Sequence, residues 1–114
     1  MKLEVFFKKL NKTPELIEFT ETMATIESNY VFAETAFSNG LQQNAAGENS
    51  GSCKIFLFAK LNSLSEAQTL ACFGTYYRDD VLAHPEASDH QNIRQFIING
   101  WKGINFNSEA LLVK

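Results

Sequence analysis

The first quarter of the chain repeats apolar residues at intervals of three and four, which is the spacing of one helix face. A first helix is therefore predicted over Lys2–Asn11, with an apolar stripe formed by Leu3, Phe6, Phe7 and Leu10. Thr13, Pro14 and Glu15 have the composition of a helix start, because threonine caps free amides and proline fits the first turn. A second helix is predicted from there to about Glu27, with an inward face formed by Leu16, Phe19, Met23 and Ile26.

The pattern then changes to short runs of β-branched and aromatic residues, which favour strands. Short strands are predicted at Tyr30–Phe32, Thr35–Phe37 and Leu41–Gln43, with Asn39 and Gly40 forming a turn. A loop rich in glycine and amides follows. Next comes Ser52–Leu61, which is apolar almost all round and predicts a central buried helix or else a buried strand.

Capping boxes indicate two further helices. One is predicted to begin at Ser65 and to continue through Gly74 to Leu82. The other is predicted to begin at Ser88, after a break at Pro85. The second of these ends at Gly100, and a last short strand is expected at Ile104–Phe106. The pattern as a whole predicts one compact α+β domain over residues 1–114, with about five helices around a small curved sheet built from residues 30–43 and 104–106.

Composition and charge exclude several classes of protein. The 114 residues are 45% hydrophobic, which suffices for one core, and carry a net charge of −3 with no basic face for nucleic acid. The longest apolar run, Ile55–Ala59, is far too short to span a bilayer, and lysines interrupt the N-terminal apolar run before it could act as a secretory signal. Both cysteines lie in apolar surroundings and are expected to be reduced. We therefore expect a soluble, cytoplasmic protein, present as a monomer or a weak homo-oligomer.

Residues capable of chemistry are concentrated between Phe73 and Gly103, where both arginines, both histidines and the single tryptophan occur. His90 with Asp79 or Asp80 is the candidate acid–base pair. The candidate ligand-binding residues are Arg78, Arg94, Asn92, Cys53 and Trp101.

Each of these residues also has a structural interpretation. Cys53 could be a small buried hydrophobe, although a helix start would activate its thiol. Arg78 could belong to a buried ion-pair network, and Arg94 could form one salt bridge at a capped helix. Trp101, between two glycines, could pack in the core or anchor a ligand.

The spacing of possible metal ligands gives little support for a metal centre. His84 and His90 are six residues apart, neither HxxxH nor HxH occurs, and the two cysteines lack zinc spacing. The segment from Gly47 to Lys54 does not have the spacing of a phosphate-binding Walker loop either. No metal and no cofactor are therefore expected.

Three phrases in fixed order carry a resemblance to a known family: NAAGENSGSCKIFLFAKL, TLACFGTYYRDDVL and DHQNIRQFIINGWKGINF. With these phrases the chain resembles the HopJ (HopPmaJ) type III effector family over nearly its whole length. The resemblance implies a small bacterial α/β domain without an established biochemical activity. It also raises the hypothesis of export by a type III secretion system.

Three hypotheses for function follow. The leading one is a domain that binds a small molecule or a protein partner through a pocket beside Arg78, His90 and Arg94. The second is an enzyme, a hydrolase or transferase that uses His90 with Asp79 or Asp80. The third is a secreted effector that acts in a host cell; a flexible N-terminus would favour it, whereas a packed N-terminal helix would oppose it.

Overall fold

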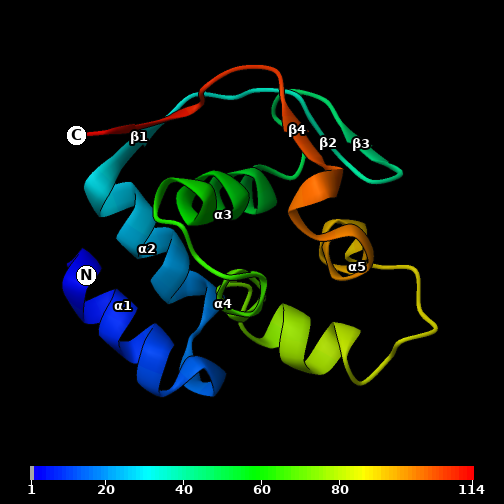
Figure 1. Cartoon of the computed structure of the whole chain (residues 1–114), viewed down its shortest axis with the longest axis horizontal. Coiled ribbons are helices and arrows are strands. Elements are labelled where there is room, and N and C mark those ends of the chain that lie inside the picture. The colour runs from blue at the N-terminus through cyan, green and yellow to red at the C-terminus, as the bar shows by residue number, and fades with distance from the viewer. Residues whose placement is uncertain (1) are drawn as a thin grey trace.

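The computed structural model describes residues 2–114, and its elements gather around one helix, α3, which spans Ser50–Leu61. Cys53 and all residues from Ile55 to Ala59 are buried in this helix. Figure 1 shows α3 in the middle of the molecule, with strands on one side and helices on the others. The apolar run is thus a central helix rather than a buried strand.

The other helical elements surround α3 (Figure 1). In chain order they are α1 (Leu3–Lys12), the 3-10 turn η1 (Pro14–Leu16), α2 (Phe19–Asn29), α4 (Glu66–Ala71), the π-helix η2 (Tyr76–Val81), α5 (Gln91–Asn99) and the 3-10 turn η3 (Gly100–Gly103). The α+β class and the compact body of helices with short strands are confirmed.

The strands form two small antiparallel sheets instead of the single sheet that was predicted. The first pairs β1 (Tyr30–Phe32) with β5 (Leu111–Val113). The second has the order β3-β2-β4, built from Gln42–Asn44, Phe37–Asn39 and Ile104–Phe106. No strand was predicted at β5 from the sequence.

The second helix begins later than its sequence suggests. Pro14–Leu16 forms only a 3-10 turn, and Ile17, not Leu16, is the residue buried in the core. Glu18 and Glu21 then form the capping box that starts α2. Burial would raise the pKa of Glu21, but the hydrogen bond from Lys9, the Glu18 N–H and the charge of Lys9 together hold it below its ordinary value.

The helix predicted from Ser65 to Leu82 is interrupted. Its capping box forms, with Ser65 Oγ accepting from the Gln68 N–H, but α4 ends at Ala71. Gly74 has φ +62, and its Cα lies so close to the backbone of Phe19 that a Cβ would approach the Phe19 nitrogen to 2.7 Å. The chain then continues as the π-helix η2, a type of turn that often occurs at functional sites.

The start of α5 also differs from the prediction. Ser88 and Gln91 do not form a capping box; instead His90 precedes the helix with φ 51 and ψ 48, in the left-handed region. The side chain of Gln91 donates to the Ser88 carbonyl at 2.8 Å. Gly100 ends α5 with φ 61, as predicted.

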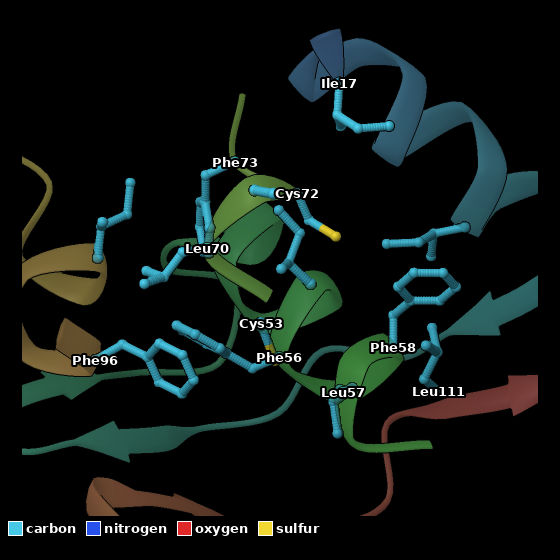
Figure 2. Packing of buried hydrophobic residues seen from close by; sticks show 14 of the residues in the cluster. Ile17, Cys53, Phe56, Leu57, Phe58, Leu70, Cys72, Phe73, Phe96 and Leu111 are labelled. Carbon is cyan, nitrogen blue, oxygen red and sulfur yellow. The ribbon is translucent and has the colours of Figure 1, made fainter. Parts of the chain in front are cut away.

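The core is rich in aromatic rings that pack mainly edge to face or tilted. Phe56 of α3 contacts Phe73, Phe96 and Trp101 at ring-centroid distances of 5.5, 5.0 and 6.4 Å. Figure 2 shows Phe56 and Phe96 directed toward each other from α3 and α5. These contacts pack the second turns of α3 and α5 against one another, next to the first turns that line the candidate site.

Candidate functional site

A cavity of about 320 Å³ lies where the first turns of α3 and α5 meet. Its lining consists of Phe19, Gln42, Asn49, Gly51, Ser52, Phe73, Tyr76, His90, Gln91, Asn92 and Ile93. Aromatic side chains and neutral polar groups therefore share the wall. This combination, in a cavity of about this size, is typical of sites for small molecules.

Aromatic rings line one wall of the cavity. The rings of Phe19 and Tyr76 meet edge to face at 5.1 Å, and Tyr76 continues to the imidazole of His90 at 5.2 Å with a 39° tilt. Phe19 opens α2, Tyr76 opens η2 and His90 precedes α5, so three segments distant in sequence contribute to the wall. Tyr76 is 42% exposed, which leaves part of its ring available for contact with a ligand.

Amide side chains hold the opposite part of the cavity in place. Asn39 Nδ2 donates to Asn92 Oδ1 at 3.2 Å, and Asn92 Nδ2 donates to Asn44 Oδ1 at 3.0 Å. Asn49 Nδ2 also donates to Asn44 Oδ1, at 2.7 Å. Asn92, a predicted binding residue, thus lines the cavity while its amide fastens α5 to strands β2 and β3.

Two carboxylates converge on one nitrogen of His90 at the edge of the cavity. Nε2 lies 3.0 Å from Asp80 Oδ2 and 3.7 Å from Asp89 Oδ2. The π-helix supplies Asp80, and the loop before α5 supplies Asp89. The three side chains are between one quarter and just over one half exposed, so solvent reaches them. The predicted proximity of His90 and Asp80 is present in the structure.

Arg94 holds the loop that carries Asp89 and His90 in place. Its side chain is only 10% exposed and donates to the backbone carbonyls of Asp89 and His84, at 2.6 and 2.9 Å. Its Nη2 also bonds Asp89 Oδ1 at 2.6 Å. This hydrogen bond holds the pKa of Asp89 below its ordinary value and outweighs the opposing effect of desolvation, with help from the neighbouring His90.

The other arginine, Arg78, connects η2 to the segment that precedes α2. Arg78 Nη1 donates to the carbonyl of Ile17 at 2.9 Å, and its Nη2 lies 3.8 Å from Glu18. Neither Arg78 nor Arg94 lines the cavity, because both guanidinium groups hold backbone carbonyls in place. Asp79 is exposed beside Asp80 and lies outside the carboxylate–histidine group.

Cys53 and Trp101 also lie outside the cavity lining. Cys53 is buried, and desolvation raises the pKa of its thiol to about 11, the reverse of the activation that a helix start could provide. Trp101 packs edge to face on Phe96 at 5.1 Å and is part of the wall of a separate hollow near Lys60. The binding roles of Arg78, Arg94, Cys53 and Trp101 remain predictions, and none of the four residues lines the cavity.

Several residues of the cavity were not selected from the sequence. Tyr76 and Ser52 were noted only within longer motifs, and Phe19 was assigned to the core. Asn49 could have been found, because asparagine tolerates the left-handed backbone, φ 51, that it adopts before α3, and the loop around it is rich in glycine. Gln42 gave no signal, since a single amide in a strand is ordinary.

A larger groove of about 780 Å³ runs along β4, β5 and the end of α3. Its lining is mostly aliphatic and includes Lys60, Glu109 and Val113. It also has polar residues, but it contains no histidine and does not adjoin the group formed by Asp80, Asp89 and His90. We therefore place the candidate site at His90 rather than in this larger groove.

The fold and the site define a small α+β domain with one polar–aromatic cavity between two helix starts. The chain belongs to the HopJ family: the model of the HopJ type III effector protein matches residues 3–111. A solved structure titled as the crystal structure of unknown function protein VPA0580 is similar to it, with a TM-score of 0.98 and 57% identity over all of this chain and 95% of that one. No match was found among curated proteins. Within residues 2–114, no helix is long and apolar enough to cross a membrane.

Proposed function

We propose that this protein binds a small polar molecule in the cavity between α3 and α5. The observation that carries the proposal is the meeting of an aromatic wall with neutral polar groups in one hollow of about 320 Å³. Phe19, Tyr76 and His90 offer ring faces for a flat part of a ligand. Asn49, Ser52 and other polar groups of the lining offer hydrogen bonds.

The charge of the lining narrows the class of ligand. No lysine, arginine or carboxylate is among the lining residues, whose polar side chains are amides, hydroxyls and the imidazole of His90. The ligand should therefore be recognised mainly through stacking and hydrogen bonds. A small molecule with a flat ring and polar substituents fits this chemistry best.

The proposal is tested by filling the cavity. Ser52 lines the cavity on the first turn of α3, so Ser52→Phe should occupy the hollow without removing a core side chain. Ser50, on the same turn but outside the lining, gives the matched control Ser50→Phe. A library of small metabolites is screened by saturation-transfer NMR on all three proteins.

We expect hits on the native protein and on Ser50→Phe, with loss of at least about tenfold in affinity for Ser52→Phe. Hits that bind the folded Ser52→Phe protein as tightly as the native one would overturn the proposal. A screen that yields no hits on the native protein would also count against it.

One observation favours an enzyme as a second candidate. The 3.0 Å contact between His90 and Asp80 can orient the imidazole, leaving Nδ1 for a proton of a bound substrate. A hydrolase or transferase of this type should lose about 10²–10⁴-fold in rate on His90→Asn. Unchanged turnover in that variant would exclude His90 as the acid or base.

The position of α1 supports a resident protein of the bacterial cytoplasm over an exported effector. Phe6 and Leu10 of this helix are buried, so residues 3–12 are part of the core and not a flexible segment. A bacterial reporter fusion that leaves the cell only when a type III system is intact would contradict this.

A further inference from the structure

We propose that Asp80, Asp89 and His90 form a binding site for a divalent transition-metal cation at the edge of the cavity. One ligand atom from each residue lies within 4.8 Å of the others. The spacing of residues in the sequence did not predict this set. Asp80 lies on the π-helix η2 and contacts His90, which is ten positions later in the chain.

The distances among the three groups are compatible with a shared cation. A metal bound at about 2.0–2.2 Å places neighbouring nitrogen and oxygen ligands about 3 Å apart. Nε2 of His90 lies 3.0 and 3.7 Å from its two carboxylate neighbours. A neutral imidazole has at most one proton on this nitrogen, and that proton can be donated well to only one of the two carboxylates. A cation in the same place contacts all three groups.

The charge balance also leaves room for a cation. Two carboxylates and the Arg94 guanidinium sum to a formal charge of −1 while His90 is neutral. Arg94 occupies only Oδ1 of Asp89, so Oδ2 is available. Arg94 would act as the outer-shell partner that orients a ligating carboxylate, a common feature of metal sites.

The ligand types select the kind of metal. One imidazole and two carboxylates favour Zn²⁺ or Mn²⁺ over Mg²⁺ and Ca²⁺, which prefer oxygen ligands alone. Three protein ligands leave at least one coordination position for water or another ligand. Because His90 also lines the cavity, a molecule bound there could reach the metal.

The metal site stands independently of the proposed ligand binding. The cavity-filling experiment above is performed without added metal and depends on Ser52, whereas the metal test uses the three ligand residues and no organic ligand. A negative result in either experiment leaves the other claim unaffected.

The test is a calorimetric titration of the metal-free native chain with Zn²⁺, repeated with Mn²⁺. The variants are Asp80→Asn and His90→Asn; asparagine tolerates the left-handed backbone of position 90 and is a weaker ligand. Matched controls are Asp79→Asn and His84→Asn, which change the same residue types at nearby exposed positions. Circular dichroism verifies that each variant is folded.

We expect one equivalent of Zn²⁺ on the native chain and on both controls. The affinity of each of the two cluster variants should fall at least about tenfold. The proposal is overturned if the native chain shows no saturable binding of either metal. It is equally overturned if folded Asp80→Asn and His90→Asn bind as the native chain does, or if the controls lose as much affinity as the cluster variants.

Discussion

Arg94 shows how one side chain can organise several segments. It is nearly buried, and its guanidinium reaches the carbonyls of His84 and Asp89 together with the Asp89 carboxylate. A planar group with five donors can satisfy such a set, whereas an ammonium group cannot do so with the same geometry. Arg94 thus fixes the loop that brings His90 and Asp89 to the cavity.

Arg94→Ala should therefore lower the free energy of unfolding by about 2–3 kcal/mol, because it leaves the backbone carbonyls of His84 and Asp89 without their donor and removes a nearly buried side chain. Arg94→Lys should recover only part of the loss. Urea unfolding followed by circular dichroism measures both. The exposed Lys102→Ala serves as control and should change stability by less than about 0.5 kcal/mol. If Arg94→Lys is as stable as the native chain, the fork geometry is unimportant.

The two cysteines give a second prediction at the same scale. Burial raises the thiol pKa to about 11 at Cys53 and about 12 at Cys72, from an ordinary 9.0. Because the thiolate is the reactive form, neither residue should react with Ellman's reagent in the native chain at pH 8, and both should react in urea. Rapid labelling of the folded protein would show that Cys53 is activated after all.

The same burial predicts a loss of stability at alkaline pH. The folded chain holds both thiol protons to a higher pH than the unfolded chain does, so the free energy of unfolding is unaffected at neutral pH and falls as pH rises from about 9 toward 11. Cys72→Ala should reduce this fall, measured by urea unfolding at pH 8 and pH 10.5.

Among the elements, the break between α4 and η2 is the most consequential. The apolar spacing continues through Gly74 to Leu82, and the sequence alone therefore predicts one long helix. In the structure Gly74 approaches the backbone at the start of α2, and the chain resumes as a π-helix that carries Tyr76 and Asp80 to the site. A glycine is required at position 74 because of its positive φ and its close approach to Phe19, and not because of helix propensity.

Gly74→Ala should thus destabilise the protein by about 2–3 kcal/mol, through both its φ of +62 and the clash with the Phe19 nitrogen. Gly47→Ala is the matched control: its φ is +87, but the added Cβ would meet only the Glu34 carboxylate, and we expect about 1 kcal/mol. Thermal unfolding compares the two. Equal losses of stability in the two variants would mean that the close contact between position 74 and the Phe19 backbone does not contribute to the destabilisation.

The helix positions followed from the sequence where the local signals were strong. The apolar stripe of α1, the capping box at Ser65 and the stop at Gly100 all occur as predicted. The failures lie where tertiary contacts decide: the later start of α2, the π-helix, and the left-handed His90 that replaces a capping box. His90 was predicted to pair with Asp79 or Asp80, and Asp80 is the residue in contact. Of the amide and aromatic lining only Asn92 was predicted, because the rest depends on contacts between distant segments.

At the scale of the whole molecule, the N-terminal helix α1 packs against the central helix and covers part of the core. Phe6 is fully buried and contacts Phe58 edge to face at 5.8 Å, while the half-buried Phe7 stacks on the same ring at 5.7 Å. Phe58 belongs to the central helix. Folding of the N-terminal helix is thus coupled to folding of the whole chain.

Phe6→Ala should cost about 3–5 kcal/mol of unfolding free energy, and Phe7→Ala clearly less, because only the first leaves a closed cavity beside Phe58. Urea unfolding with two probes tests this. A Phe6→Ala loss no larger than that of Phe7→Ala would indicate that α1 is only loosely attached.

The most direct test of the central claim is a map of ligand binding on the native chain by two-dimensional ¹H–¹⁵N NMR, with hits from the metabolite screen. The account predicts that the largest shifts occur at amides of Asn49–Ser52 and His90–Ile93, the first turns on both sides of the cavity. Shifts centred instead on Lys60 and residues 104–113, around the larger groove, would contradict it.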